Sequence, residues 1–278
     1  MAISKISKST ISSGINKYDN FAAVDYPTLP YTEGLVMWYD ADDVSSISLG
    51  SGTQVSQWND KSGNSRHASQ SNSSLRPNYL TNALNGKPAI DFGAAIGTVR
   101  LDIASNRYQF STKSIHAFAV GKTRYESNTD FSSFFGGYAA DQATSAGSLA
   151  YSFPGNAGSL GNGSQQFLNT SRAWFPSGNK FDYSSSQFYQ VNASWDGVTV
   201  AYRQSRTDDG SATFDGTGLS NKISYPCNAI GWQEGSSYGS TITIAELIIY
   251  DKPLSASDIA KVESYLFSTI PNSKYFKR

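Results

Sequence analysis

Short stretches in which hydrophobic and polar residues alternate recur along the chain from Gly34 onward, separated by Gly, Asn and Asp. A period of two places the apolar side chains on one face of a β-strand. The clearest case is a hairpin in which 189–195 leads through Asp196-Gly197 into 198–202. With a two-residue loop, Trp195 would face Val198 and Val191 would face Tyr202. We expect further strands at 35–39, 55–59, 88–92, 115–121, 132–135, 148–153, 227–232 and 241–250. This pattern predicts an all-β fold in which two antiparallel sheets are stacked.

A helical period is found near the carboxyl terminus. Ser255 is a suitable N-cap, and Ile259, Val262 and Leu266 fall on one stripe, so we expect one short C-terminal helix. Residues 1–32 are instead rich in Ser and Lys and end in Pro27-Thr28-Leu29-Pro30. We interpret 1–32 as an extended N-terminal anchoring arm, with a disordered leader as the alternative. The expected organisation is this arm, one sandwich domain over 33–270, and a tail over 271–278.

Several blocks of the sequence resemble a known family. The segments 34–43 (GLVMWYDADD), 55–64 (VSQWNDKSGN) and 85–92 (NGKPAIDF) resemble the opening of the concanavalin A-like, laminin-G-type jelly rolls, and 245–255 (AELIIYDKPLS) resembles their closing strand. The resemblance extends over roughly 33–270. It implies a two-sheet antiparallel jelly-roll sandwich, a fold used for glycan binding, adhesion and particle display, with glycosidases as a catalytic minority.

The arrangement of a short Ser- and Lys-bearing arm before a single jelly roll is similar to that of tailed-phage surface proteins, either tail fibres or capsid decoration. The amino terminus lacks the continuous apolar stretch of a secretory signal. The resemblance therefore implies synthesis in the host cytoplasm and a place on the virion surface. It also implies that residues 1–32 bind other virion subunits and that the domain is displayed as a homo-oligomer or a multicopy array.

Charge and composition exclude several other partners. The chain carries 22 basic and 22 acidic residues, so its formal net charge is zero. A nucleic-acid-binding protein usually shows a basic excess, and we expect no nucleic acid as a partner. The apolar runs are much shorter than the roughly 20 residues that span a bilayer, so we expect no membrane insertion either. The one cysteine, Cys227, cannot form an internal disulfide.

Catalytic motifs are poorly represented. A glycosidase needs two carboxylates beside the scissile bond, and the sequence holds five Glu without a Glu-x-Asp-x-x-Glu strand. The segment Gly235-Ser236-Ser237-Tyr238-Gly239 matches a nucleophile elbow but precedes a strand rather than a helix. We therefore expect that the chain is not an enzyme, and we keep a glycoside hydrolase with an unconventional acid pair as the least favoured alternative.

Asp40, Asp42 and Asp60 are candidate calcium ligands, because carboxylate oxygens are the ligands that calcium prefers. The alternative is that these side chains hydrogen-bond to the backbone of their own turns. No cofactor is required by the sequence, and calcium is the one that these residues suggest.

Aromatic residues in Ser-, Gly- and Asn-rich segments are the candidate glycan contacts, since aromatic rings cover the apolar faces of sugars. They are Trp174, Tyr125, Tyr138, Tyr183 and Tyr238. The alternative is that they cap the ends of the sandwich. The sequence thus predicts a lectin-like, non-catalytic jelly-roll module on a virion that binds cell-surface polysaccharide for host attachment. A purely structural decoration or cement protein is the alternative.

Overall fold

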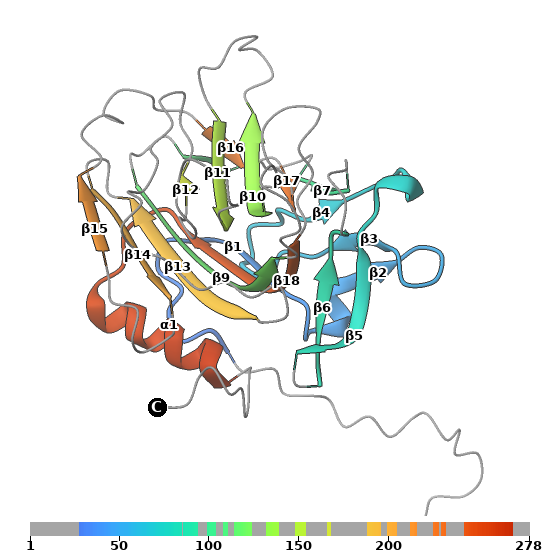
Figure 1. The fold of residues 1–278 in the computed structure, drawn as a ribbon, viewed down its shortest axis with the longest axis horizontal. Helices are drawn as coiled ribbons and strands as arrows, with labels where there is room; N and C mark the ends of the chain where they lie inside the picture. The colour runs from blue at the N-terminus through green and yellow to red at the C-terminus, as the bar shows by residue number, and fades with distance from the viewer. Residues whose placement is uncertain are drawn as a thin grey trace, which may run out of the picture.

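The computed structural model describes residues 28–84, 86–93, 99–103, 108–110, 114–123, 132–138, 148–153, 166–167, 188–195, 199–204, 212–215, 225–227, 229–231 and 242–268. In these ranges the chain forms two large antiparallel β-sheets stacked face to face, with one α-helix against the outside of one of them. Figure 1 shows the two layers, with β9, β13 and β14 in one and β10 and β11 in the other. The predicted sandwich class is confirmed.

The sheet that carries the helix, here called sheet A, has β18 in its middle. Its strands, in spatial order, are β15 (Ala212–Asp215), β14 (Thr199–Gln204), β13 (Tyr189–Trp195), β9 (Ile115–Thr123), β18 (Ile242–Tyr250), β6 (Lys87–Asp91) and β5 (Asn78–Leu84), and β1 (Leu35–Asp40) also pairs with β18. All nine residues of β18 are buried. This strand is apolar on both faces because one face meets the opposite sheet and the other meets the helix.

The opposite sheet, sheet B, is built from shorter strands. In spatial order they are β12 (Gln166–Phe167), β11 (Ser148–Phe153), β10 (Ser132–Tyr138), β17 (Ala229–Ile230), β7 (Leu101–Asp102), β4 (Ala68–Ser69), β3 (Val55–Trp58) and β2 (Ile47–Leu49). A separate pair joins β8 (Tyr108–Phe110) to β16 (Tyr225–Cys227), and two short 3-10 helices lie at Val44–Ser46 and Ser73–Leu75.

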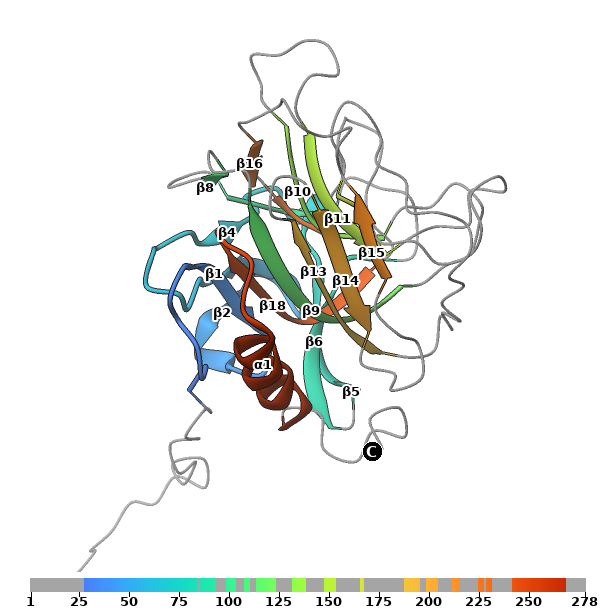
Figure 2. The same ribbon diagram turned by 90° about the vertical axis from the view of Figure 1, so that its left-hand side faces the viewer.

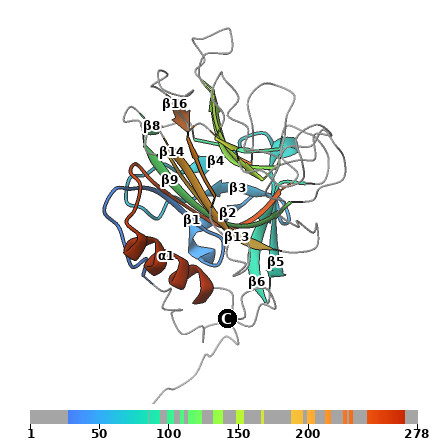
Figure 3. The ribbon, with the colours of Figure 1, turned by 60° about the vertical axis from the view of Figure 1, so that its left-hand side comes forward.

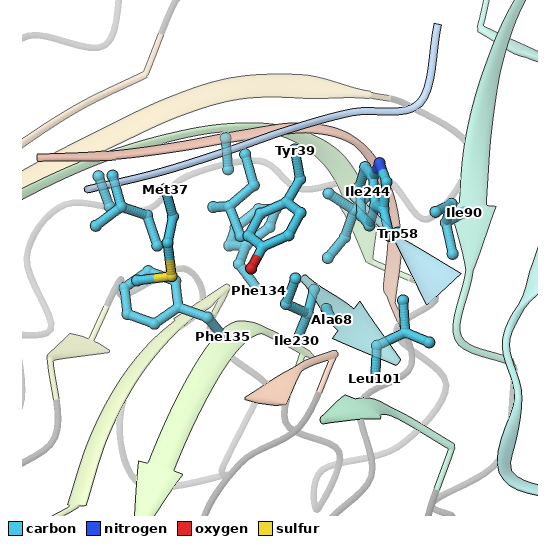
Figure 4. Close-up of a cluster of buried hydrophobic side chains, with 14 of the residues drawn as sticks. Met37, Tyr39, Trp58, Ala68, Ile90, Leu101, Phe134, Phe135, Ile230 and Ile244 are labelled. Atoms are coloured by element: carbon cyan, nitrogen blue, oxygen red, sulfur yellow. The ribbon is translucent and has the colours of Figure 1, made fainter. Parts of the chain in front are cut away.

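The main hydrophobic core lies between the two sheets. Figure 4 shows Met37 and Tyr39 of sheet A pointing toward Phe134 and Phe135 of sheet B. The sheets approach closely at Gly121, where an added Cβ would lie 2.7 Å from the Thr243 carbonyl oxygen and 2.8 Å from the Phe134 ring. Burying each large apolar side chain stabilises the fold by about 1.5–3 kcal/mol, so this layer supplies the main stability of the sandwich.

The helix α1 (Ala256–Ser268) covers the outer face of sheet A (Figures 2 and 3). The predicted N-cap is confirmed, because the Ser255 hydroxyl accepts the Asp258 backbone N–H at 3.2 Å and donates to the Asp258 carboxylate at 2.7 Å. Val262 and Leu266 are fully buried against this face. None of the described residues belongs to a helix with the length and hydropathy of a membrane span.

Residues 28–32, which we assigned to the arm, are packed onto the same face. Leu29 is 3% exposed and belongs to the cluster beneath α1. The Tyr250 hydroxyl donates to the Tyr31 carbonyl oxygen at 2.9 Å. Residues 1–27, the rest of the predicted arm, and 271–278, the predicted tail, lie outside the described residues.

The 59–67 segment, which contains the Asp-Lys-Ser-Gly-Asn sequence, covers the edge of β1 that does not pair with β18. One edge of β1 pairs with β18, and this segment satisfies backbone groups on the other edge. The Trp38 N–H donates to Asp60 Oδ1 at 3.0 Å, and the Lys61 N–H donates to the Trp38 carbonyl oxygen at 2.8 Å. The Val36 carbonyl oxygen accepts from Ser62, Asn64 and Arg66 side chains. A strand edge that is covered in this way cannot pair with another chain.

The predicted 189–202 hairpin forms, but the pairing of its two strands differs by two residues from the register that we predicted. Trp195 pairs with Val200 and Ala193 with Tyr202, whereas a two-residue Asp-Gly loop would have paired Trp195 with Val198. A shift of two keeps every side chain on its own face, so the alternating pattern fits both registers equally well. The alternating pattern therefore does not determine the loop length, which depends on how the two strands pair within the whole sheet.

Candidate functional site

The five aromatic residues predicted to contact glycan are not placed by the structure. Trp174, Tyr125, Tyr183 and Tyr238 lie outside the described residues, and for Tyr138 only the backbone at the end of β10 is described. Their role in binding stays a prediction.

The strand ends next to three of these residues do lie together. In sheet A, Thr123 at the end of β9 pairs with Ile242 at the start of β18, and Gly121 pairs with Tyr189 at the start of β13. Tyr125 comes just after β9, and Tyr183 and Tyr238 come shortly before β13 and β18. A residue's distance from its strand end is limited by about 3.3–3.6 Å per residue of chain. The described strand ends that precede or follow these three residues in the sequence are therefore neighbours at one end of sheet A.

The three predicted calcium ligands are described, and each has protein partners. Asp40 forms an ion pair with Lys61 at 2.8 Å, and Asp42 forms one with Lys87 at 2.5 Å. Within the described ranges, no group of three or more His, Cys, Asp or Glu side chains could hold a metal ion. The calcium hypothesis therefore gains no support from the part of the chain described.

The Asp60 side chain hydrogen-bonds to backbone groups of its own turn, which was the alternative to calcium binding. Its Oδ1 accepts the N–H groups of Trp38 and Ser62, and its Oδ2 accepts the Arg66 N–H and the Ser62 hydroxyl, all within 3.0 Å. The Asp60 N–H in turn donates to His67 Nδ1 at 3.1 Å. Four donors occupy the carboxylate, so this side chain organises the 59–67 segment.

A buried charge cluster lies on the outer face of sheet A, beside α1. We define it as Asp40, Asp43, Lys61 and Glu246. The Lys61 ammonium lies 2.8 Å from Asp40 and 2.9 Å from Asp43, and it also lies 4.4 Å from the centre of the Trp38 ring. Glu246 faces Asp40 as its partner in the β1–β18 ladder and accepts a 2.9 Å hydrogen bond from Trp38 Nε1. Asp40 and Glu246 are each only 3% exposed.

The pKa values of the acids in the cluster are shifted in different directions. Burial raises the pKa of Glu246 well above its ordinary value, and the neighbouring Asp40 charge raises it further. Burial also raises the pKa of Asp40, although Lys61 acts in the opposite direction. For Asp43, burial is outweighed by hydrogen bonds from Ser45 and Lys61, so that its pKa is lowered. The pKa of Lys61 is raised, because Asp40 and Asp43 outweigh its burial.

Two adjacent carboxylates are a necessary feature of most glycosidases, and the sequence did not reveal this pair. The sequence showed five Glu without a paired motif, and Asp40 was a candidate calcium ligand or turn residue. The available signal was Glu246 itself, a carboxylate in a run that is otherwise apolar, because a buried carboxylate needs a partner. The pair is nevertheless closed off from solvent by Trp38 and Tyr265, whereas a glycosidase needs its acids within reach of a sugar.

Comparison with known proteins shows the fold. No family model matches the sequence, and no curated protein matches it. A solved GH54 α-L-arabinofuranosidase, soaked with 4-nitrophenyl α-L-arabinofuranoside, matches with a TM-score of 0.59 and 14% identity, over 78% of this chain and 51% of the enzyme. The Trypanosoma rangeli sialidase in complex with sialic acid matches with a TM-score of 0.50 and 15% identity, over 89% of this chain and 35% of the enzyme. This chain thus spans about a third to a half of those enzymes.

A third structure is matched over almost its whole length. It is Domain 4 of AbnA, a GH43 extracellular arabinanase from Geobacillus stearothermophilus, in complex with arabinotriose. The TM-score is 0.51 and the identity 16%, over 82% of this chain and 97% of that domain. At these identities the likeness concerns the fold.

The comparisons correct the function that we expected from the sequence. A virion-anchored module for host attachment is not what the structural neighbours indicate, because those named above are glycosidases or a domain of one. The expectation depended on the composition of residues 1–32, and composition specifies no geometry. The same neighbours are enzymes or come from enzymes, so the fold is also compatible with a catalytic role.

Proposed function

We propose that this chain is a carbohydrate-binding β-sandwich domain that works in the context of glycoside hydrolysis. The observation that carries the proposal is the match over 97% of a separate domain of an arabinanase, whose structure contains arabinotriose. We place the chain among the concanavalin A-like sandwiches on the sequence blocks at 34–43, 55–64 and 245–255.

The buried charge cluster does not favour hydrolysis by Asp40 and Glu246. Asp40 and Glu246 face each other, but they are covered, and Asp40 is engaged by Lys61. A general acid has to come within about 3 Å of the glycosidic oxygen. These carboxylates would need the helix to move before they could meet a sugar.

The end of sheet A at which β9 ends and β13 and β18 begin is the proposed location of the site. Stacking one ring on roughly 100 Å² of a sugar face gains about 2–3 kcal/mol. That gain is similar to the loss of translational and rotational freedom on association, at about 4 kcal/mol or more. A binding site with one or two such contacts is therefore weak.

The test uses the full chain and several polysaccharides. Retardation in gels that contain arabinan, xylan or a sialylated glycan detects weak binding, and we expect retardation by arabinan to be the strongest. Tyr125→Ala and Tyr238→Ala should each reduce retardation severalfold. Leu49→Ala, which removes an exposed apolar side chain (47% exposed) at the edge of sheet B, is the control and should leave retardation unchanged.

Two results would contradict the proposal. One is the absence of retardation by every polysaccharide at millimolar sugar-unit excess. The other is release of reducing sugar from any of them by the purified chain, which would make it a hydrolase and direct attention to Asp40 and Glu246.

A further inference from the structure

Glu246 connects sheet A to the helix. On one side its Oε1 accepts the Trp38 indole N–H at 2.9 Å. On the other side Tyr265 of α1 packs edge-on against the Trp38 ring, with centroids 6.2 Å apart, and its hydroxyl interacts with the Glu246 carboxylate. Part of the burial of Glu246 is therefore supplied by the helix.

The charges of the cluster do not balance if every group is ionised. Asp40, Asp43 and Glu246 would contribute three negative charges around the ammonium of Lys61. A buried carboxylate without a cation is strongly unfavourable, and such a group keeps its proton instead. Lys61 forms ion pairs with Asp40 and Asp43, so its one positive charge is shared among the acids of the cluster.

Docking of α1 affects the proton on Glu246 in two opposing ways. The helix removes water from the carboxylate, which favours the protonated form, while the Tyr265 hydroxyl favours the ionised form. Burial is the larger effect, and the pKa of Glu246 is raised well above its ordinary value. A group whose pKa is raised by docking contributes stability to the docked state at low pH, and this contribution is lost as pH rises through the raised value.

We propose that Glu246 is a proton-dependent latch for α1: the helix is held on sheet A while Glu246 keeps its proton, and its carboxyl-terminal half is released when Glu246 and Asp40 are both ionised. The groups that face Glu246 are Asp40 of β1, Lys61 of the 59–67 segment, and Trp38 and Tyr265. The charge of Asp42 also acts on Tyr265.

A second set of polar contacts holds the middle and the beginning of the helix. The Leu254 N–H donates to His116 Nδ1 at 3.2 Å, and His116 Nε2 lies 3.2 Å from Asn192 Oδ1. The Asn192 amide then donates to Glu263 Oε1 at 2.9 Å. These contacts involve neither Glu246 nor Tyr265. Release is therefore expected to begin at Tyr265 and Leu266.

An open groove of about 530 Å³ lies beside α1. One wall is the helix, through Lys261, Ser264 and Tyr265, and another is the segment that contains Thr28 and Pro30. When the helix lifts, the groove widens and Glu246 becomes accessible to solvent.

Hydrogen exchange of the full chain between pH 5 and 9 tests the latch. After correction for the intrinsic exchange rate, protection of the amides in 256–268 should fall with rising pH by up to about tenfold per pH unit, the slope for one proton. Protection in β9 and β13 should remain constant. Glu246→Gln keeps an acceptor for Trp38 Nε1 and cannot ionise, so its helix protection should not depend on pH.

Glu33→Gln is the matched control, because Glu33 is an exposed carboxylate that pairs with Lys252, and its profile should follow that of the unchanged protein. The proposal is overturned if the unchanged protein keeps constant helix protection, or if Glu246→Gln loses protection in parallel with it. Should Glu246→Gln fail to fold, carboxyl ¹³C titration of the five Glu in the unchanged protein decides the question. If all five Glu residues titrate near their ordinary pKa, this result contradicts the latch.

Discussion

The two faces of sheet A are buried by different means. The inner face meets sheet B in a continuous layer of apolar side chains, with Met37 and Tyr39 on sheet A and Phe134 on sheet B. The outer face combines an apolar patch around Trp38 and Val262 with the buried charge cluster and the His116 contacts. Apolar burial is non-directional and stabilises many arrangements, whereas hydrogen bonds and ion pairs require one geometry. The inner face therefore supplies stability, and the outer face fixes where the helix lies.

The largest expected effect on the free energy of unfolding is in the apolar layer between the inner face of sheet A and sheet B. Phe134→Ala should lower the free energy of unfolding by about 3–5 kcal/mol, because Phe134 is fully buried and its loss leaves a cavity next to Gly121. The loss should be the same at pH 5 and pH 8, as no charged group is involved. Urea denaturation at the two pH values measures it. A strongly pH-dependent loss would contradict the distinction between an apolar inner face and an outer face that contains charged groups.

Lys61→Met on the outer face should lower the free energy of unfolding by about 3 kcal/mol at pH 7, since it leaves Asp40 and Asp43 buried without their cation. The lowered pKa of Asp43, where burial is outweighed by Ser45 and Lys61, means that its stabilising contribution is present at neutral pH and lost in acid. The effect of the substitution should therefore shrink as pH falls below 4. Denaturation curves of both proteins at pH 7 and pH 3 give the comparison, and equal losses at the two pH values would argue against the ion pairs.

Gly231→Ala tests how tightly the inner face is packed. Gly231 has a φ of +71°, and an added Cβ would lie 2.0 Å from the Phe92 ring. Backbone strain and displacement of a buried ring together should destabilise the fold by about 2 kcal/mol. Thermal unfolding measures the change. Gly52→Ala, with a φ of +62° and open space around it, is the control for strain alone and should cost about 1 kcal/mol.

The smallest effect is expected at the start of the helix. Ser255→Ala removes the N-cap and should destabilise α1 by about 1 kcal/mol. Hydrogen exchange should show lower protection in 256–268, with that of β9 unchanged. Equal loss of protection in both would mean that the helix and sheet A unfold as one unit.

The strands that form the centre of sheet A were predicted well, and the reason is local. Runs such as 115–121 and 241–250 carry enough β-branched and aromatic residues to indicate strands without any knowledge of their neighbours. Short strands such as β4 and β7 hold two residues each and leave no periodic signal. Turn chemistry was a sound alternative for Asp60 because two of its partners, Ser62 and Arg66, are close in sequence, whereas its contact with Trp38 was not predictable locally.

The pair of Asp40 and Glu246 could not be recognised in the same way. These residues are separated by most of the domain along the chain, and pairing of β1 with β18 brings them together. The local sequence around either residue contains no information about the other residue. The raised pKa values of both follow first from burial, to which α1 contributes as another contact between distant segments.

Local patterns alone thus determined an all-β chain with a capped helix at its end, because alternation and capping depend on residues within a few positions of one another. Only the tertiary structure decided the hairpin register, the covered edge of β1 and the buried charge cluster. Each of these depends on which strands become neighbours, and that choice is made by the packing of both sheets and the helix together.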